Sequence, residues 1–232
     1  MSGAHPIALL LRDPEEVARR CAAEEGLRPL AVASMAVLLI GGAVFGGVVG
    51  SFRGDAQILY SAIKLPLALF GALVICVPAF HAVAACLGRP WPLRTIVALT
   101  IAAAGRAALV LLAFAPLLWL GIDLGLGYHA SALATALAYG SSGLAALGVL
   151  LRGLGEGAHR GVTATAFVAI FLAAGAQTGW TLRPFLGRPS QASVPFVRDV
   201  EGGFADALVM SARSAMGDYD PRAERDAYGG AR

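Results

Sequence analysis

The residues from Leu30 to Phe52, LAVASMAVLLIGGAVFGGVVGSF, form an apolar run without a charged side chain. At a rise of about 1.5 Å per residue, a helix of this length crosses the ~30 Å hydrocarbon core of a bilayer. Four further stretches carry little or no charge, so the sequence predicts five transmembrane helices, at about 30–52, 65–87, 95–120, 129–151 and 162–182. The expected fold is therefore all-α, a multi-pass transmembrane helical bundle occupying residues 30–182.

The composition excludes several other classes of protein. Hydrophobic residues make up 57% of the chain and charged residues 14%, which is far from the balance of a soluble domain. The basic residues flank the apolar stretches without interleaved aromatics, so no nucleic-acid partner is expected. Cys21, Cys76 and Cys86 are widely spaced and lie in no Cys/His cluster, so no metal and no cofactor is expected.

Two segments flank the predicted bundle. Residues 1–29 are expected to form an amphipathic segment with a helix that begins at Asp13, since Asp13 and Glu16 match a capping box. This segment either lies along an anionic membrane surface or packs on the bundle. Residues 183–216 are predicted to be extramembrane with a short amphipathic helix, and residues 217–232 to be a disordered tail.

The distribution of basic residues predicts the orientation. The short outer links hold only Arg53 and Lys64, whereas the predicted inner segments hold Arg12, Arg19, Arg20, Arg28, Arg89, Arg94, Arg152 and Arg160. The positive-inside rule therefore favours a cytoplasmic N-terminus in a bacterial inner (plasma) membrane. An odd number of spans then places the C-terminal tail outside, although the arginines of the tail weaken that choice.

Arg106 and His81 are the candidate residues for a polar path. Arg106 falls near the middle of the third span, where a guanidinium usually faces a partner, a water-filled cavity or an anion. Alternatively, its long side chain reaches the inner interface. His81 follows Pro78 by about one turn, so its ring N–H is expected to donate to a freed carbonyl; a proton relay is the alternative.

Gly42, Gly46 and Gly50 give the first span a doubled G-x-x-x-G pattern on one helix face. Small residues at this spacing allow two helix backbones to approach closely within a membrane. The pattern predicts helix packing, and this face is the expected contact with a membrane-protein partner or with a second copy of the chain.

Three stretches together resemble a group of uncharacterised bacterial five-span inner-membrane proteins. They are QILYSAIKLP at 57–66, QTGWTLRPFLG at 177–187 and PFVRDVEGGF at 195–204. The resemblance rests on a Lys-x-Pro entry to the second span and a Trp-x-Leu-Arg-Pro-Phe exit from the fifth. It implies five spans and no particular activity. The topology is also loosely similar to that of the Yip family.

These stretches are expected to lie on one outer face and to form a docking surface. Phe196 and Phe204 would anchor the tail there. The candidate residues are Asp55, Lys64, Arg183, Phe185, Arg198 and Glu201. Both a structural clamp and a binding site fit this arrangement.

Motifs of membrane enzymes are missing from the sequence. There is no H-E-x-x-H, and Glu24, Glu25 and Arg28 give E-E-x-x-R, which differs from the E-E-x-x-x-R of prenyl-protein proteases. The predicted function is therefore a non-enzymatic scaffold or a subunit of a membrane assembly. The alternative is a small permease or channel in which Arg106 and His81 line a polar path.

Overall fold

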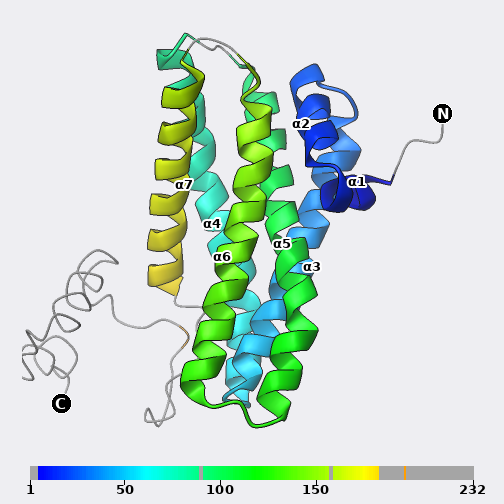
Figure 1. Cartoon of the computed structure of the whole chain (residues 1–232), viewed down its shortest axis with the longest axis vertical. Coiled ribbons are helices and arrows are strands. Elements are labelled where there is room, and N and C mark those ends of the chain that lie inside the picture. The colour runs from blue at the N-terminus through cyan, green and yellow to red at the C-terminus, as the bar shows by residue number, and fades with distance from the viewer. Residues whose placement is uncertain (1–4, 89–90, 157–158, 183–195, 197–232) are drawn as a thin grey trace, which may run out of the picture.

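The computed structural model describes residues 5–88, 91–156 and 159–182, together with Phe196 (Figure 1). This part of the chain is all α. Its helices are α1 (Pro6–Arg12), α2 (Pro14–Ala23), α3 (Leu27–Ser51), α4 (Ala56–Cys86), α5 (Leu93–Asp123), α6 (Tyr128–Gly153) and α7 (Arg160–Leu182). Five of them, α3 to α7, are long and apolar enough to cross a membrane, which confirms the predicted fold class. The predicted C-terminal helix and tail lie outside the described residues.

The second span begins earlier than predicted. Helix α4 starts at Ala56 and includes the polar residues Gln57, Ser61 and Lys64, all of which are buried. The sequence prediction places the start near residue 65, because these polar side chains lower the local hydropathy and so resemble a loop. With 31 residues each, α4 and α5 extend for about 46 Å, which is longer than the ~30 Å hydrocarbon core.

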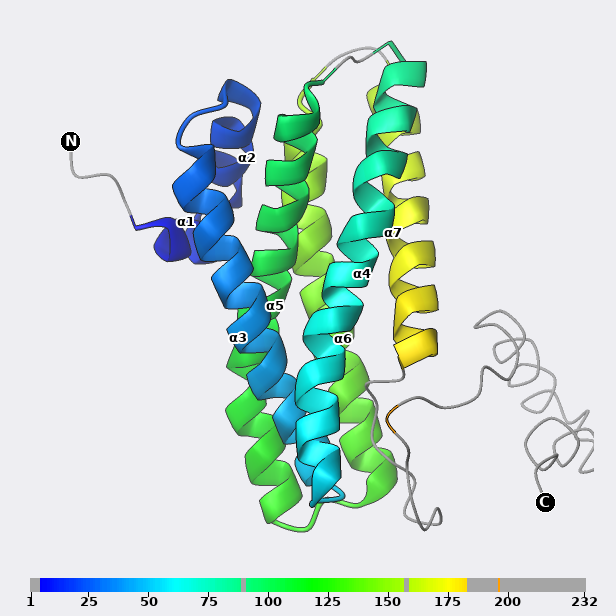
Figure 2. The same ribbon diagram turned by 180° about the vertical axis from the view of Figure 1, so that it is seen from behind.

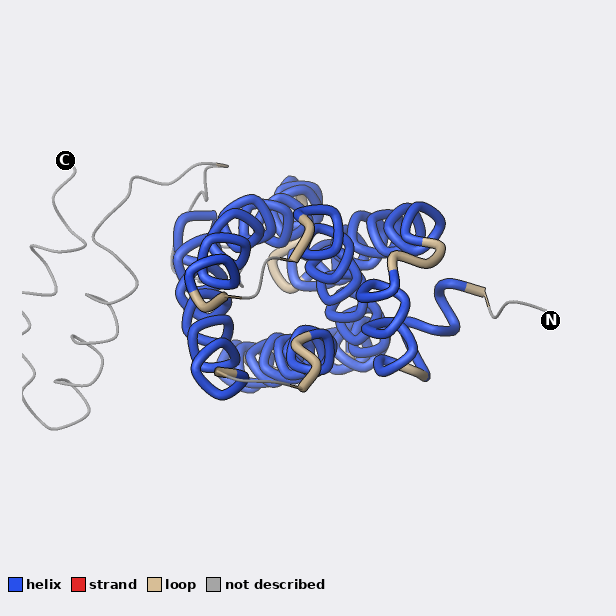
Figure 3. The backbone as a smooth tube through the Cα atoms, turned by 90° about the horizontal axis from the view of Figure 1, so that it is seen from above, coloured by secondary structure: helices blue, strands red, loops and turns tan. Residues whose placement is uncertain are grey.

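The five long helices stand side by side around a common axis, as the view from above shows (Figure 3). Helix α3 packs between α4 and α5, α6 packs on α5, and α7 packs on α4. The contact between α6 and α7 is slight. The loops α4–α5 and α6–α7 lie at the same end of the bundle as α2, and the other two turns lie at the opposite end (Figures 1 and 2).

The glycines of α3 form its interface with α4. A Cβ atom at Gly46 would overlap the carbonyl oxygen of Ser61, and one at Gly50 would overlap that of Gln57. At Gly42 it would lie 3.2 Å from Cγ of Pro66. The predicted close packing is therefore present, but α4 of the same chain covers the glycine face of α3. A partner chain would need another surface.

Helices α1 and α2 form a pair that packs on the side of the bundle. The side chains of Leu10, Val17 and Cys21 are fully buried. Helix α2 contacts α5 and α6, whereas α1 contacts α3 and α5. Asp13 ends α1 and caps α2, because its carboxylate accepts a hydrogen bond of 2.9 Å from the backbone N–H of Glu16. The sequence predicts that the N-terminal segment either lies along a membrane surface or packs on the bundle, and in the structure it packs on the bundle.

Candidate functional site

Arg106 contacts the helix pair. Its Nη1 donates a hydrogen bond of 3.0 Å to the carbonyl oxygen of Leu10. Leu10 lies in the last turn of α1, where the backbone carbonyls have no partner within the helix. A cation at this end of a helix is also favoured by the helix dipole. The guanidinium of α5 thus satisfies a backbone group of the N-terminal segment.

His81 is not joined to Arg106 by a hydrogen bond. It lies on α4, is partly buried, and its buried Nδ1 has no hydrogen-bond partner in the described part of the chain. The expected bond to a carbonyl near Pro78 is therefore not formed by Nδ1. The described structure provides no continuous polar path that connects the two candidates.

Arg152 of α6 approaches Arg106. Its Nη1 donates to the carbonyl oxygen of Gly148, at 2.8 Å, so the side chain turns back along α6 by about one turn. Helices α5 and α6 are antiparallel, and Gly153 lies against Leu99, which brings Gly148 close to the level of Arg106. The two guanidinium groups are close enough for their like charges to repel each other. No pattern in the sequence connects these two arginines, since Arg152 follows the predicted fourth span at 129–151.

One ion pair and one hydrogen bond attach the end of α2 to the bundle. The carboxylate of Glu24, which follows α2, accepts a hydrogen bond of 2.6 Å from Nε of Arg94 and one of 3.2 Å from Oγ1 of Thr95. Glu24 has a φ of 58°, a left-handed conformation that terminates α2. These contacts join the end of α2 to the first turn of α5.

The outer side of α2 carries its own ion pairs. Glu16 binds Arg19 through Nε at 2.6 Å and Arg20 through Nε at 2.8 Å. Hydrogen bonds from Arg19 and then Arg20 lower the pKa of the Glu16 carboxyl to about 2. Burial raises the pKa of the Cys21 thiol, on the inner side of the same helix, to about 11.

Part of the predicted docking surface is assembled on α4. The Nζ of Lys64 lies 5.2 Å from the centroid of the Phe196 ring, and Tyr60 meets the same ring edge-on at 5.4 Å. Gln57 donates to Oγ of Ser61 at 3.2 Å. Residue 196 from the third quoted stretch therefore contacts the first one.

The other members of that surface are placed differently. Lys64 lies inside α4 and is 2% exposed, so it does not mark the edge of the span. Asp55 is exposed in the turn before α4. The remaining candidates, which are Arg183, Phe185, Arg198 and Glu201, lie outside the described residues.

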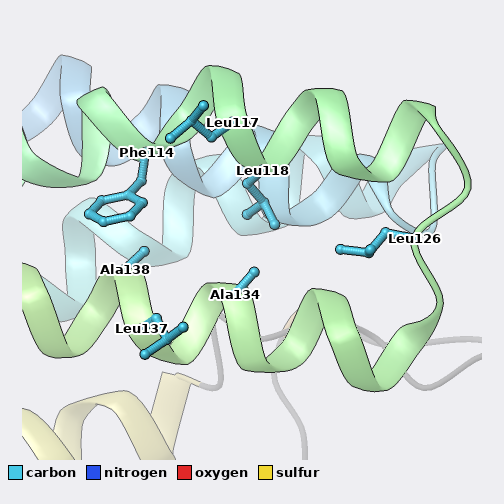
Figure 4. Close-up of a pocket in the computed structure, with 7 residues that line it drawn as sticks. All are labelled: Phe114, Leu117, Leu118, Leu126, Ala134, Leu137 and Ala138. Atoms are coloured by element: carbon cyan, nitrogen blue, oxygen red, sulfur yellow. The ribbon is translucent and has the colours of Figure 1, made fainter.

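An apolar pocket of about 200 Å³ lies between α5 and α6 at the end away from the helix pair (Figure 4). Its lining side chains carry no polar atoms; they are Phe114, Leu117, Leu118, Leu126, Ala134, Leu137 and Ala138. Such a lining offers contact to hydrocarbon and no group for catalysis.

In the described residues, no group of three or more His, Cys, Asp or Glu side chains is placed to hold a metal ion. Comparison of the chain with known protein families, with curated proteins and with solved structures finds no match. The function is therefore inferred from the contacts of the chain itself. Its five long apolar helices make it a multi-pass membrane protein.

Proposed function

We propose that the chain is a non-enzymatic scaffold or a subunit of a membrane assembly, and that the helix pair α1–α2 is its docking platform. The observation that carries the proposal is the hydrogen bond from Arg106 to the carbonyl oxygen of Leu10. An arginine in a membrane-spanning helix is costly unless its guanidinium reaches polar groups, and the group that it reaches is a candidate for function. Here that guanidinium holds the N-terminal segment against the bundle.

The two sides of the platform differ in chemistry. Its inner side is apolar and buried, whereas its outer side exposes charges of both signs, from Arg12, Glu15 and Arg19, with Glu25 in the turn that follows α2. A fixed pattern of mixed charge selects partners by electrostatic complementarity. The platform therefore suits a protein partner at the membrane surface.

The buried hydroxyl groups favour a scaffold over the alternative of a small permease or channel. Ser34, Thr100, Thr135 and Ser142 donate to a carbonyl of their own helix, and Thr163 donates to the carbonyl of His159, directly before α7. Their hydrogen-bonding capacity is thereby largely used within single helices. A hydrated path needs polar groups that are free to bind water or an ion.

The proposal includes a location in the bacterial inner membrane with the helix pair in the cytoplasm. Most of the described basic residues lie at the end of the bundle that carries the helix pair and the α4–α5 and α6–α7 loops. They are Arg12, Arg19, Arg20, Arg28, Arg94, Arg152 and Arg160. The turn between α3 and α4, at the opposite end, contributes Arg53. This asymmetry follows the positive-inside rule.

Photocrosslinking in native membranes tests the proposal. A photoreactive residue in place of Glu15, on the outer side of the platform, is expected to give a discrete adduct with a protein. The matched control is Leu137, an exposed apolar residue of α6, which is expected to give lipid adducts. Charge reversal by Arg19→Glu is expected to reduce the adduct at position 15.

An anion-flux assay in proteoliposomes separates the two functions. The scaffold is expected to give the flux of protein-free vesicles. A chloride or phosphate flux that disappears in Arg106→Gln, combined with no protein adduct at position 15, would establish the permease instead.

A further inference from the structure

The exposed apolar side chains of the spans form a band that ends before the helix-pair end of the bundle. On α4 they extend from Ile58 to Ile75, a distance of about 26 Å along a helix. The described residues from Cys76 to Cys86 add no exposed Leu, Ile, Val or aromatic side chain. On α6 the last such residue before Gly153 is Leu144. This band has nearly the thickness of a ~30 Å hydrocarbon core.

Isolated exposed apolar residues beyond the band do not move its boundary. They are Val32, Leu93 and Val162. Single exposed side chains of this kind are common on water-facing surfaces as well.

Helix α1 marks the same boundary. It lies across the long axis of the bundle (Figures 1 and 2). Leu9 and Leu10 face the bundle, whereas Ile7 and Leu11 are exposed beside the charged Arg12. A crosswise amphipathic helix with exposed apolar residues is typical of the zone between headgroups and acyl chains.

The guanidinium of Arg106 therefore lies at the level of lipid headgroups, because it is bonded to Leu10 of this helix. Arg152 brings a second guanidinium to a similar level from α6, by its bond to Gly148. The described residues place no carboxylate in an ion pair with either arginine. Arg106 is partly buried and Arg152 is exposed, and an anion bound between them would relieve the repulsion of their like charges.

We propose that Arg106 and Arg152 together bind the phosphate group of an anionic phospholipid whose acyl chains lie along the apolar band. Each guanidinium has five N–H donors and uses one for a backbone carbonyl, so donors remain for phosphate oxygens. Arginine pairs with phosphate in a forked, two-bond geometry. The site is independent of whether a protein docks on α1–α2.

Lipid binding is tested on the full chain in phosphatidylcholine nanodiscs that contain a minor fraction of phosphatidylglycerol. The bound lipid is identified by native mass spectrometry after detergent release. We expect preferential retention of phosphatidylglycerol, and a loss of about tenfold in Arg152→Gln, the effect of removing one charged hydrogen-bonding partner. The matched control is Arg160→Gln, which removes an exposed arginine at the same end of the bundle.

Two features keep the test decisive. Arg152→Gln leaves the bond between Arg106 and Leu10 in place, so its effect is separate from any release of the helix pair. Equal retention in Arg152→Gln, Arg106→Gln and the unchanged chain would overturn the proposal, as would an equal loss in Arg160→Gln.

Excess inorganic phosphate distinguishes the source of the anion. It is expected to leave the bound phosphatidylglycerol in place, because the apolar band holds the acyl chains. Displacement by phosphate would overturn the lipid assignment and identify a site for a free anion.

Discussion

The α3–α4 interface and the contact of the helix pair with the bundle are built by different means. The first is a close approach of two backbones, with glycines of α3 against carbonyl groups of α4. The second buries whole side chains such as Leu10 and Val17, and adds the bonds of Arg106 and Glu24. Within the bilayer, close packing of small residues associates helices, because lipid is as apolar as leucine. Outside it, burial of large apolar side chains and ion pairs contribute.

The largest effect is expected at the glycine interface. Gly46→Ala places a methyl group on the carbonyl of Ser61 and should lower the free energy of unfolding by about 3 kcal/mol, the upper range for overpacking. At Gly47 the nearest atoms are 3.9 Å away, so Gly47→Ala should be neutral or stabilising by up to about 1 kcal/mol. Unfolding monitored by steric trapping in bicelles measures both. Equal effects at the two positions would remove the distinction between the two kinds of contact.

The next effect is expected at Arg106. Arg106→Gln removes a charged hydrogen bond, worth about 1.5–3 kcal/mol, and should loosen the helix pair. The readout is alkylation of Cys21 in a background with Cys76→Ala and Cys86→Ala. Burial holds the pKa of the Cys21 thiol at about 11, so little reactive thiolate exists near neutral pH until the pair opens.

We expect alkylation of Cys21 to become about tenfold faster in Arg106→Gln. Loss of the hydrogen bond lowers the free energy of opening by at least the amount that changes the opening equilibrium about tenfold. The control Arg160→Gln should keep the original rate. An unchanged rate in Arg106→Gln would show that the apolar contacts alone hold the pair.

A smaller effect is expected at Glu24. Glu24→Gln weakens the surface ion pair with Arg94, which is worth less than about 1 kcal/mol. Alkylation of Cys21 should accelerate by about two- to threefold at low salt and less at high salt. Combining Glu24→Arg with Arg94→Glu should restore part of the protection. Failure of the restoration, with both single variants impaired, would mean that Glu24 acts mainly through Thr95 or its backbone.

The smallest effect is expected from pH. The folded-state pKa of Glu16 is lowered to about 2 from an ordinary value of 4.5, so its contribution is present above about 4.5 and is lost as the pH falls toward 2. Hydrogen exchange of α2 amides, corrected for intrinsic rates, should show decreasing protection across this range. Glu16→Gln should have lower protection at pH 6 and lack this decrease. The same decrease in both proteins would assign it to another carboxyl.

The number of spans could be predicted from the sequence because each is a separate apolar run. The start of α4 could not, since Gln57 and Lys64 are polar residues on a buried helix face. Their environment depends on α3 and, for Lys64, on Phe196, which lies far along the chain. A window of hydropathy contains none of these neighbours.

Arg106 could be singled out from the sequence as a candidate residue, whereas its contacts and its proximity to Arg152 could not. Arg106 stands out as a charge within a span, but its partner Leu10 is 96 positions away and offers a backbone carbonyl, which no side-chain pattern encodes. The glycine spacing likewise predicts a close approach without naming the approaching helix. Local patterns therefore identify groups that need a partner, and tertiary structure determines which partner they have.

The contacts of the helix pair also constrain how the protein is made. The pair is synthesised before α3 to α7, yet α2 packs on α5 and α6, which are synthesised much later. Until those helices have entered the membrane, Val17 and Cys21 lack the surface that buries them, and Arg106 lacks the carbonyl of a docked α1. Helix α2 therefore stays undocked while the α3–α4 hairpin assembles from neighbouring sequence, although α1 already has its contact surface on α3, and the docking of α2 requires α5 and α6 to be in place.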